Sequence, residues 1–173
     1  MRMSLNKTVS MDLSTQSINQ AIREVKQYKQ QLVNFCNALM RRLVEDGMVV
    51  AQMNVMSMNA VYTGQLEDSI QGVFFPEEKL GVIFTNVPYA LFVEFGTGIV
   101  GAEGPQHPMK GDVGWEHDVN NHGNKGWVYY LKTDGVNEFR WTKGMPSRPF
   151  MYETLRWLEQ NAPKIASEVA ANA

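Results

Sequence analysis

The sequence contains little cysteine and no long apolar run. Its one cysteine, Cys36, cannot form an intrachain disulfide, which excludes a disulfide-stapled secreted domain and favours synthesis in a reducing compartment. No stretch approaches the ~18 apolar residues of a membrane span, and residues 1–9 lack the apolar core of a signal peptide. We therefore expect a soluble protein without a membrane partner that is not exported by a signal peptide.

A strong excess of charge of either sign is also missing. The formal net charge of -2 excludes a strong global attraction to nucleic acid, and we expect no direct sequence-specific nucleic-acid binding. Hydrophobic residues make up 44% of the 173 positions, which is enough to bury a core. We expect one domain over residues 1–173.

Apolar residues at three- and four-residue steps predict a long amphipathic helix near the N-terminus. A capping box at Ser17-Ile18-Asn19-Gln20 marks its start. A pause at Gly47 is expected before the helix resumes over residues 48–56. Cys36 falls on the apolar stripe, so we expect a small core residue there. The stripe consists of Ile18, Ile22, Val25, Tyr28, Leu32, Cys36, Leu39 and Leu43.

The same periodicity predicts a second helix at the C-terminal end. It enters through Ser147-Arg148-Pro149-Phe150, with Ser147 as its N-cap. Pro163 lies inside the pattern and predicts a kink, or a split into two helices, near Asn161.

Two hairpins are expected between these helices. The first pairs residues 69–75 with 80–85, after a turn at residues 62–66. The second has a two-residue turn at Asp134-Gly135, which places Tyr130 opposite Phe139 and Val128 opposite Trp141 and makes one face aromatic. The layout predicts an α+β fold, in which a long N-terminal helix and a C-terminal helix pack on a small antiparallel sheet. The interface candidates are Trp127, Tyr129, Tyr130, Phe139 and Trp141.

One carboxylate, Glu94, lies in an apolar run from Tyr89 to Gly98. Pro88 and Gly96 frame a short helix over residues 89–95. An ionised group in apolar surroundings needs a partner, and we expect backbone amides of the 96–98 turn or Arg148 to supply it. A catalytic acid with a raised pKa is the alternative, but no second carboxylate or base stands at a supporting spacing.

Residues 96–126 are rich in glycine and predict a long irregular loop. The loop holds the only cluster of residues with metal-ligand composition, and their spacing matches no compact zinc pattern. Hydrolase signatures such as Gly-x-Ser-x-Gly are missing as well. We expect a solvated polar loop without metal, cofactor or catalytic residues, and keep a metal-dependent hydrolase as the alternative. The weak metal candidates are His107, His117, Asp118 and His122.

Three motifs, taken in order, resemble those of a known protein family. They are Tyr62-Thr63-Gly64-x-Leu66-x-x-Ser69-Ile70, Val87-Pro88-Tyr89-Ala90-x-x-Val93-Glu94-Phe95-Gly96-Thr97-Gly98, and Gly144-Met145-Pro146-Ser147-Arg148-Pro149-Phe150-Met151. The ordered set is similar to the tail-component proteins of long-tailed bacteriophages, the head-tail joining or tail-completion family also found in prophages. The similarity covers nearly the whole chain.

The resemblance implies a non-enzymatic structural protein of the virion, assembled in the host cytoplasm. Its implied partners are further copies in a ring, expected to be a hexamer, together with the tail-tube protein and a head-completion or neck protein. The connection over residues 97–146 is a long excursion that varies in this family. A generic host-side binding module is a third possibility. The residues with an implied structural role are Glu94, Gly96, Thr97, Gly98, Ser147, Arg148, Pro149 and Phe150.

Overall fold

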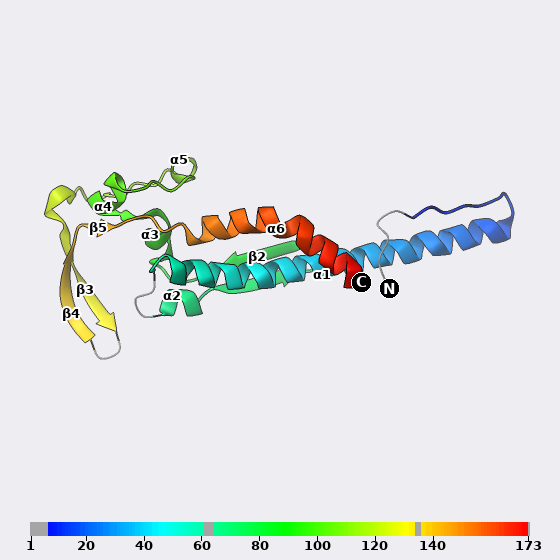
Figure 1. Ribbon diagram of the computed structural model, residues 1–173, viewed down its shortest axis with the longest axis horizontal. Helices are drawn as coiled ribbons and strands as arrows, with labels where there is room; N and C mark the ends of the chain where they lie inside the picture. Colours follow the sequence, from blue (N-terminus) through cyan, green and yellow to red (C-terminus); the bar gives the residue numbers. More distant parts are fainter. Residues whose placement is uncertain (1–6, 61–63, 134–135, 173) are drawn as a thin grey trace. The chain divides into compact units, whose positions relative to one another are not determined.

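The computed structural model describes residues 7–60, 64–133 and 136–172 and confirms the α+β fold (Figure 1). The long helix α1 (Thr15–Ser57) and the C-terminal helix α6 (Phe150–Asn172) pack together and on small antiparallel two-stranded sheets. In the described part of the chain, no helix is both long and apolar enough to span a membrane.

Helix α1 begins earlier than predicted and runs without a pause. The Ser14 hydroxyl accepts the backbone N–H of Ser17 at 3.2 Å, so Ser14 is the N-cap and the prediction of Ser17 was wrong. Gly47 is buried inside the continuous helix, so the expected pause is not present. Cys36 is exposed, which corrects the expectation of a core residue.

Both predicted hairpins are present. The first consists of β1 (Gln71–Phe75) and β2 (Leu80–Phe84), preceded by the short helix α2 (Gln65–Asp68) where a turn was expected. The second consists of β3 (Trp127–Thr133) and β4 (Val136–Thr142), and its register pairs Tyr130 with Phe139 and Val128 with Trp141 as predicted. The predicted turn residues 134–135, like residues 62–63, lie outside the described residues.

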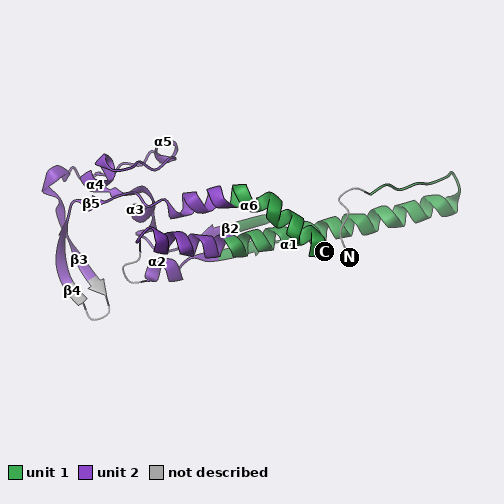
Figure 2. Ribbon diagram, in the orientation of Figure 1, with its two compact units in different colours: residues 1–46, 72–82, 158–173 green, residues 47–71, 83–157 purple. Residues whose placement is uncertain are grey.

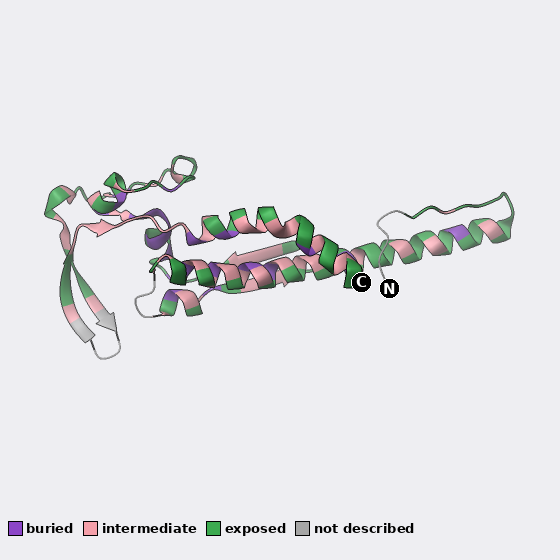
Figure 3. Ribbon diagram, viewed as in Figure 1, coloured by how far each residue is buried: buried purple, intermediate pink, exposed green. Residues whose placement is uncertain are grey.

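The chain forms two compact units, each described by itself (Figure 2). Unit 1 comprises residues 1–46, 72–82 and 158–173, and in it Gly81 of β2 lies against Met40 and Val44 of α1. Unit 2 comprises residues 47–71 and 83–157 and contains the main apolar core, whose buried residues Figure 3 marks along α1 and the start of α6. That core consists of Ala51, Val55, Leu66, Ile70, Val87, Ala90, Val93 and Phe150.

The glycine-rich segment is more ordered than predicted. After α3 (Ala90–Phe95) it contains α4 (Gly98–Glu103), α5 (Lys110–Val113) and the 3-10 helix η1 (Gly123–Lys125). The excursion then closes on itself, because β5 (Gly144–Met145) forms antiparallel bridges back to residues 97 and 98. Helix α6 is not split, since it continues through Pro163.

Candidate functional site: the Glu94 junction

Three donors converge on the buried carboxylate of Glu94, which is 6% exposed on α3. Its Oε2 accepts the backbone N–H of Met151 at 2.9 Å, and its Oε1 accepts the backbone N–H of Tyr152 at 2.9 Å. Oε1 also lies 3.0 Å from Nε2 of His107. Because both oxygens are bonded to donors from distant parts of the chain, Glu94 joins α3, the excursion and α6.

The two amides explain why a carboxylate stands here. The first N–H groups of a helix have no partner within it, and an N-cap side chain normally accepts them. Pro149 precedes α6 and has no side-chain oxygen, so Glu94 reaches across from α3 and accepts the amides of the first turn. The negative charge also lies at the positive end of the helix dipole, where it is favoured.

The predicted partners of Glu94 were wrong. The amides of residues 96–98 do not contact its carboxylate, and Arg148 Nε instead donates to the carbonyl of Met58 at the end of α1, at 3.0 Å. Ser147 is not the N-cap of α6, which begins at Phe150; its hydroxyl donates to the backbone carbonyl of Glu94 at 2.6 Å. The motif residues therefore meet in one junction, through bonds other than those expected.

His107 completes the junction as a neutral ring. Its Nδ1 accepts the backbone N–H of Met109 at 3.1 Å, so the ring proton resides on Nε2 and is donated to Glu94. The ring packs on Phe95, with centroids 4.1 Å apart, and edge-on to Tyr152. With both nitrogens bonded, this histidine has no lone pair left for a metal ion.

Gly96 lets the chain turn between the junction and the excursion. Its φ of 79° is a left-handed conformation, and a Cβ there would stand 2.7 Å from the backbone nitrogen of Ser147. Trp115 covers the turn: its Nε1 donates to the Gly96 carbonyl at 2.9 Å and its ring stacks on Phe95 at 5.2 Å.

No family model, curated protein or solved structure matches this chain.

The remaining metal candidates are not brought together. His117 is buried against Gly101, and its Nε2 has no hydrogen-bond partner in the described part of the chain. Burial, followed by the charge of Lys110, lowers the pKa of His117, while a hydrogen bond to the backbone of Phe95 opposes this. Among the described residues, no group of three His, Cys, Asp or Glu could hold a metal ion.

Asp118 organises the turn before η1. It accepts the backbone N–H groups of Gly123 at 2.7 Å and His122 at 2.9 Å, and these bonds hold the pKa of its carboxyl below the usual range. Its Oδ1 is 3.4 Å from Nδ1 of His122. These contacts of Asp118 stabilise a local turn, and they account for its position next to His122 without a bound ligand.

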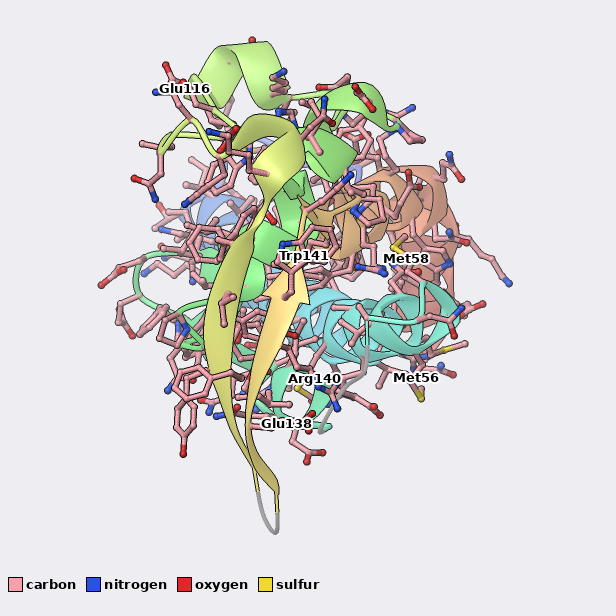
Figure 4. All side chains as sticks on the ribbon, turned by 90° about the vertical axis from the view of Figure 1, so that its left-hand side faces the viewer. Met56, Met58, Glu116, Glu138, Arg140 and Trp141 are labelled. Carbon is pink, nitrogen blue, oxygen red and sulfur yellow. The ribbon has the colours of Figure 1, made fainter. Side chains whose placement is uncertain are left out.

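The second hairpin presents an exposed aromatic face. Tyr130 is 53% and Phe139 75% exposed although their rings lie 5.1 Å apart, and Val128 and Trp141 extend the same face. Figure 4 shows Trp141, Arg140 and Glu138 along β4, with Arg140 paired to Glu138. We call Val128, Tyr130, Phe139 and Trp141 the aromatic face.

The other predicted interface residues, Trp127 and Tyr129, lie on the opposite face. The ring of Trp127 covers Gly98 and lies 4.8 Å from that of His122. Both residues line a broad pocket of about 1410 Å³, and Val128 and Tyr130 of the aromatic face line it as well.

Sequence reasoning missed Met151, Tyr152 and His107 as partners of Glu94. The one available signal was the proline at the position where an N-cap oxygen was needed.

Proposed function

We propose that this chain is a structural subunit of a phage or prophage tail, a tail-completion or head-tail connector protein that forms a ring between tail tube and capsid neck. One observation carries the proposal: the aromatic face is exposed on a two-stranded hairpin. An isolated hairpin is at best marginally stable in water, and a contiguous apolar patch of this kind marks a contact with another protein.

The junction supports this reading by bracing the excursion. The chain leaves α3 at Gly96 and returns through β5 to Ser147, and both ends are bonded to Glu94 or its neighbours. Fixed ends of the excursion hold the hairpin in place within unit 2, which a subunit needs in order to present its aromatic face to a neighbour.

The ring form of the proposed assembly is based on the motif resemblance and on symmetry. A closed ring requires one patch of each copy to meet a different patch of the next copy. The aromatic face is the first patch, and α3 offers a second in Leu91, 59% exposed, and Phe92, 46% exposed. The proposed outer partners are the tail-tube protein and a neck or head-completion protein, and the proposed location is the virion.

Deleting the gene in an induced lysogen tests the proposal. We expect electron micrographs to show DNA-filled heads beside unattached tails, and complementation by the wild-type gene to restore whole virions. Normal virions from the deletion strain would refute the connector function.

A matched pair of variants ties the phenotype to the aromatic face. Phe139→Ser with Trp141→Ser removes two exposed rings and is expected to fail in complementation while the isolated protein keeps its circular dichroism spectrum. The control is Leu155→Ser on α6, which also removes an exposed apolar side chain and should complement.

Elemental analysis separates the connector from a metal-dependent hydrolase. We expect protein purified without added metal to contain no stoichiometric zinc or manganese. A stoichiometric metal that is lost in the His117→Ala/His122→Ala variant would favour the hydrolase.

A further inference from the structure

The first half of α1, in unit 1, carries an apolar face that the described residues of the unit leave exposed. Ile22 is 46% and Val25 54% exposed, and Cys36 is exposed further along the same face. Residues 7–14 run back beside the helix but cover a different side: Asp12 N–H bonds Ser17 Oγ at 3.0 Å, and Lys7 Nζ lies 3.5 Å from Glu24. Those contacts lie about 100° round the helix from the apolar face.

The spacing on this face is that of a helix-pairing seam. Five apolar residues and one lysine follow one another at steps of four, three, four, three and four, the alternation that inserts side chains as knobs into the holes of a second helix. Beyond the seam, Leu39 and Leu43 are already half-buried. The α1 seam consists of Ile18, Ile22, Val25, Lys29, Leu32 and Cys36.

We propose that the α1 seam pairs with the α1 seam of a second copy of this chain, running antiparallel and centred on Gln27. In this register Ile18 lies opposite Cys36 of the second copy, Ile22 opposite its Leu32, and Val25 opposite its Lys29. The inference concerns the free chain and goes beyond the proposed function.

Lys29 decides the direction. A parallel pair in register would set the two copies of Lys29 against each other, two like charges within an apolar layer. The antiparallel register instead lays the methylenes of each Lys29 over Val25 of the other copy, while the ammonium reaches water at the edge.

The length of the free helix fits the same register. Helix α1 starts at Thr15, and the first hairpin of its unit meets it at Asn37, which accepts a hydrogen bond from Lys79 Nζ at 3.1 Å, and at Met40, which lies against Gly81. In a pair centred on residue 27, Thr15 of one copy lies opposite Leu39 of the other. The overlap therefore ends close to where the first hairpin meets the helix.

The single cysteine of the chain provides the test, with the full-length protein and an added thiol oxidant. Wild-type protein should stay monomeric on a non-reducing gel, because Cys36 faces Ile18 and not a second Cys36. Ile18→Cys should give a disulfide-linked dimer. Within one copy, residues 18 and 36 are about 27 Å apart along the helix, too far to form the bond.

Three further variants make the outcome decisive. Adding Cys36→Ser to Ile18→Cys should abolish the crosslink. Adding Ile22→Glu to Ile18→Cys should lower its yield about tenfold or more, because the charge enters an apolar layer. Gln27→Glu places the same charge on the opposite side of the helix and should leave the yield unchanged. Crosslinking of wild-type Cys36 to itself, retention of the crosslink in Ile18→Cys/Cys36→Ser, or no crosslink in Ile18→Cys would each overturn the proposal.

Discussion

At the scale of single residues, Glu94 links the entry into α6 to the rest of unit 2. An isolated carboxylate in an apolar run is enough to predict a specified polar site from the sequence. The identity of its partners could not be predicted, because Met151 and Tyr152 are 57 and 58 residues away and contribute only backbone amides, which every residue type carries.

The variant Glu94→Gln keeps the shape of the side chain and replaces one acceptor oxygen by a donor. The new NH₂ group must then face a backbone N–H or the Nε2–H of His107. We expect the free energy of unfolding in urea to fall by about 2–4 kcal/mol. Glu103→Gln, at an exposed position of α4, is the control and should change it by less than about 0.5 kcal/mol. Equal midpoints for the two variants would show that the carboxylate does not hold the junction.

His117 predicts a pH dependence at the same scale. Its pKa in the folded chain lies below the ordinary value of 6.5, mainly because of burial. The unfolded state therefore binds the proton first, and the stability due to neutral His117 is lost as pH falls from above 6.5 toward the lower folded pKa. Urea midpoints measured across this window should fall less steeply in His117→Gln than in wild type. Parallel slopes would contradict the assignment.

At the scale of elements, the strands and helices that could be predicted are those long enough to show a sequence periodicity. The β3–β4 register was predicted correctly because strand alternation and a two-residue turn signal leave one pairing. The short helices α4, α5 and η1 were missed, since three to six residues carry no usable periodicity and these turns depend on distant contacts such as Gly98 N–H to the His117 carbonyl.

Gly144 is expected to hold the excursion closed. It has a φ of 104°, and a Cβ there would overlap the carbonyl oxygen of Thr97 across the β5 bridge. Gly144→Ala should lower the free energy of unfolding by about 2 kcal/mol or more and expose residues 97–146 to limited proteolysis. Gly111→Ala adds the same methyl group where no atom lies within 4 Å and should be nearly neutral. Similar losses of unfolding free energy in both variants would show that adding a methyl group to a glycine is enough for the effect. The β5 bridge would then not be its cause.

At the scale of the whole molecule, a net charge of -2 and an exposed aromatic face favour association through apolar contact over charge steering. Sequence alone indicated the aromatic face, through alternation, but could not show whether another part of the same chain covers it. In the structure Phe139 and Trp141 stay more than half exposed, so the described residues of unit 2 leave this face uncovered.

The salt dependence of assembly separates apolar from charged association. The chain can be mixed with its proposed partner, a tail-tube protein, and can carry Ile22→Glu to remove the proposed α1 pairing. Light scattering of this mixture should give a particle mass that persists from about 0.05 to about 1 M salt. Surface charge pairs are screened over that range, whereas apolar contacts are not weakened. Phe139→Ser in the same background should lower the mass at every salt concentration. A particle that dissociates as salt rises would place the contact on charged residues, and the aromatic face would then need a different explanation.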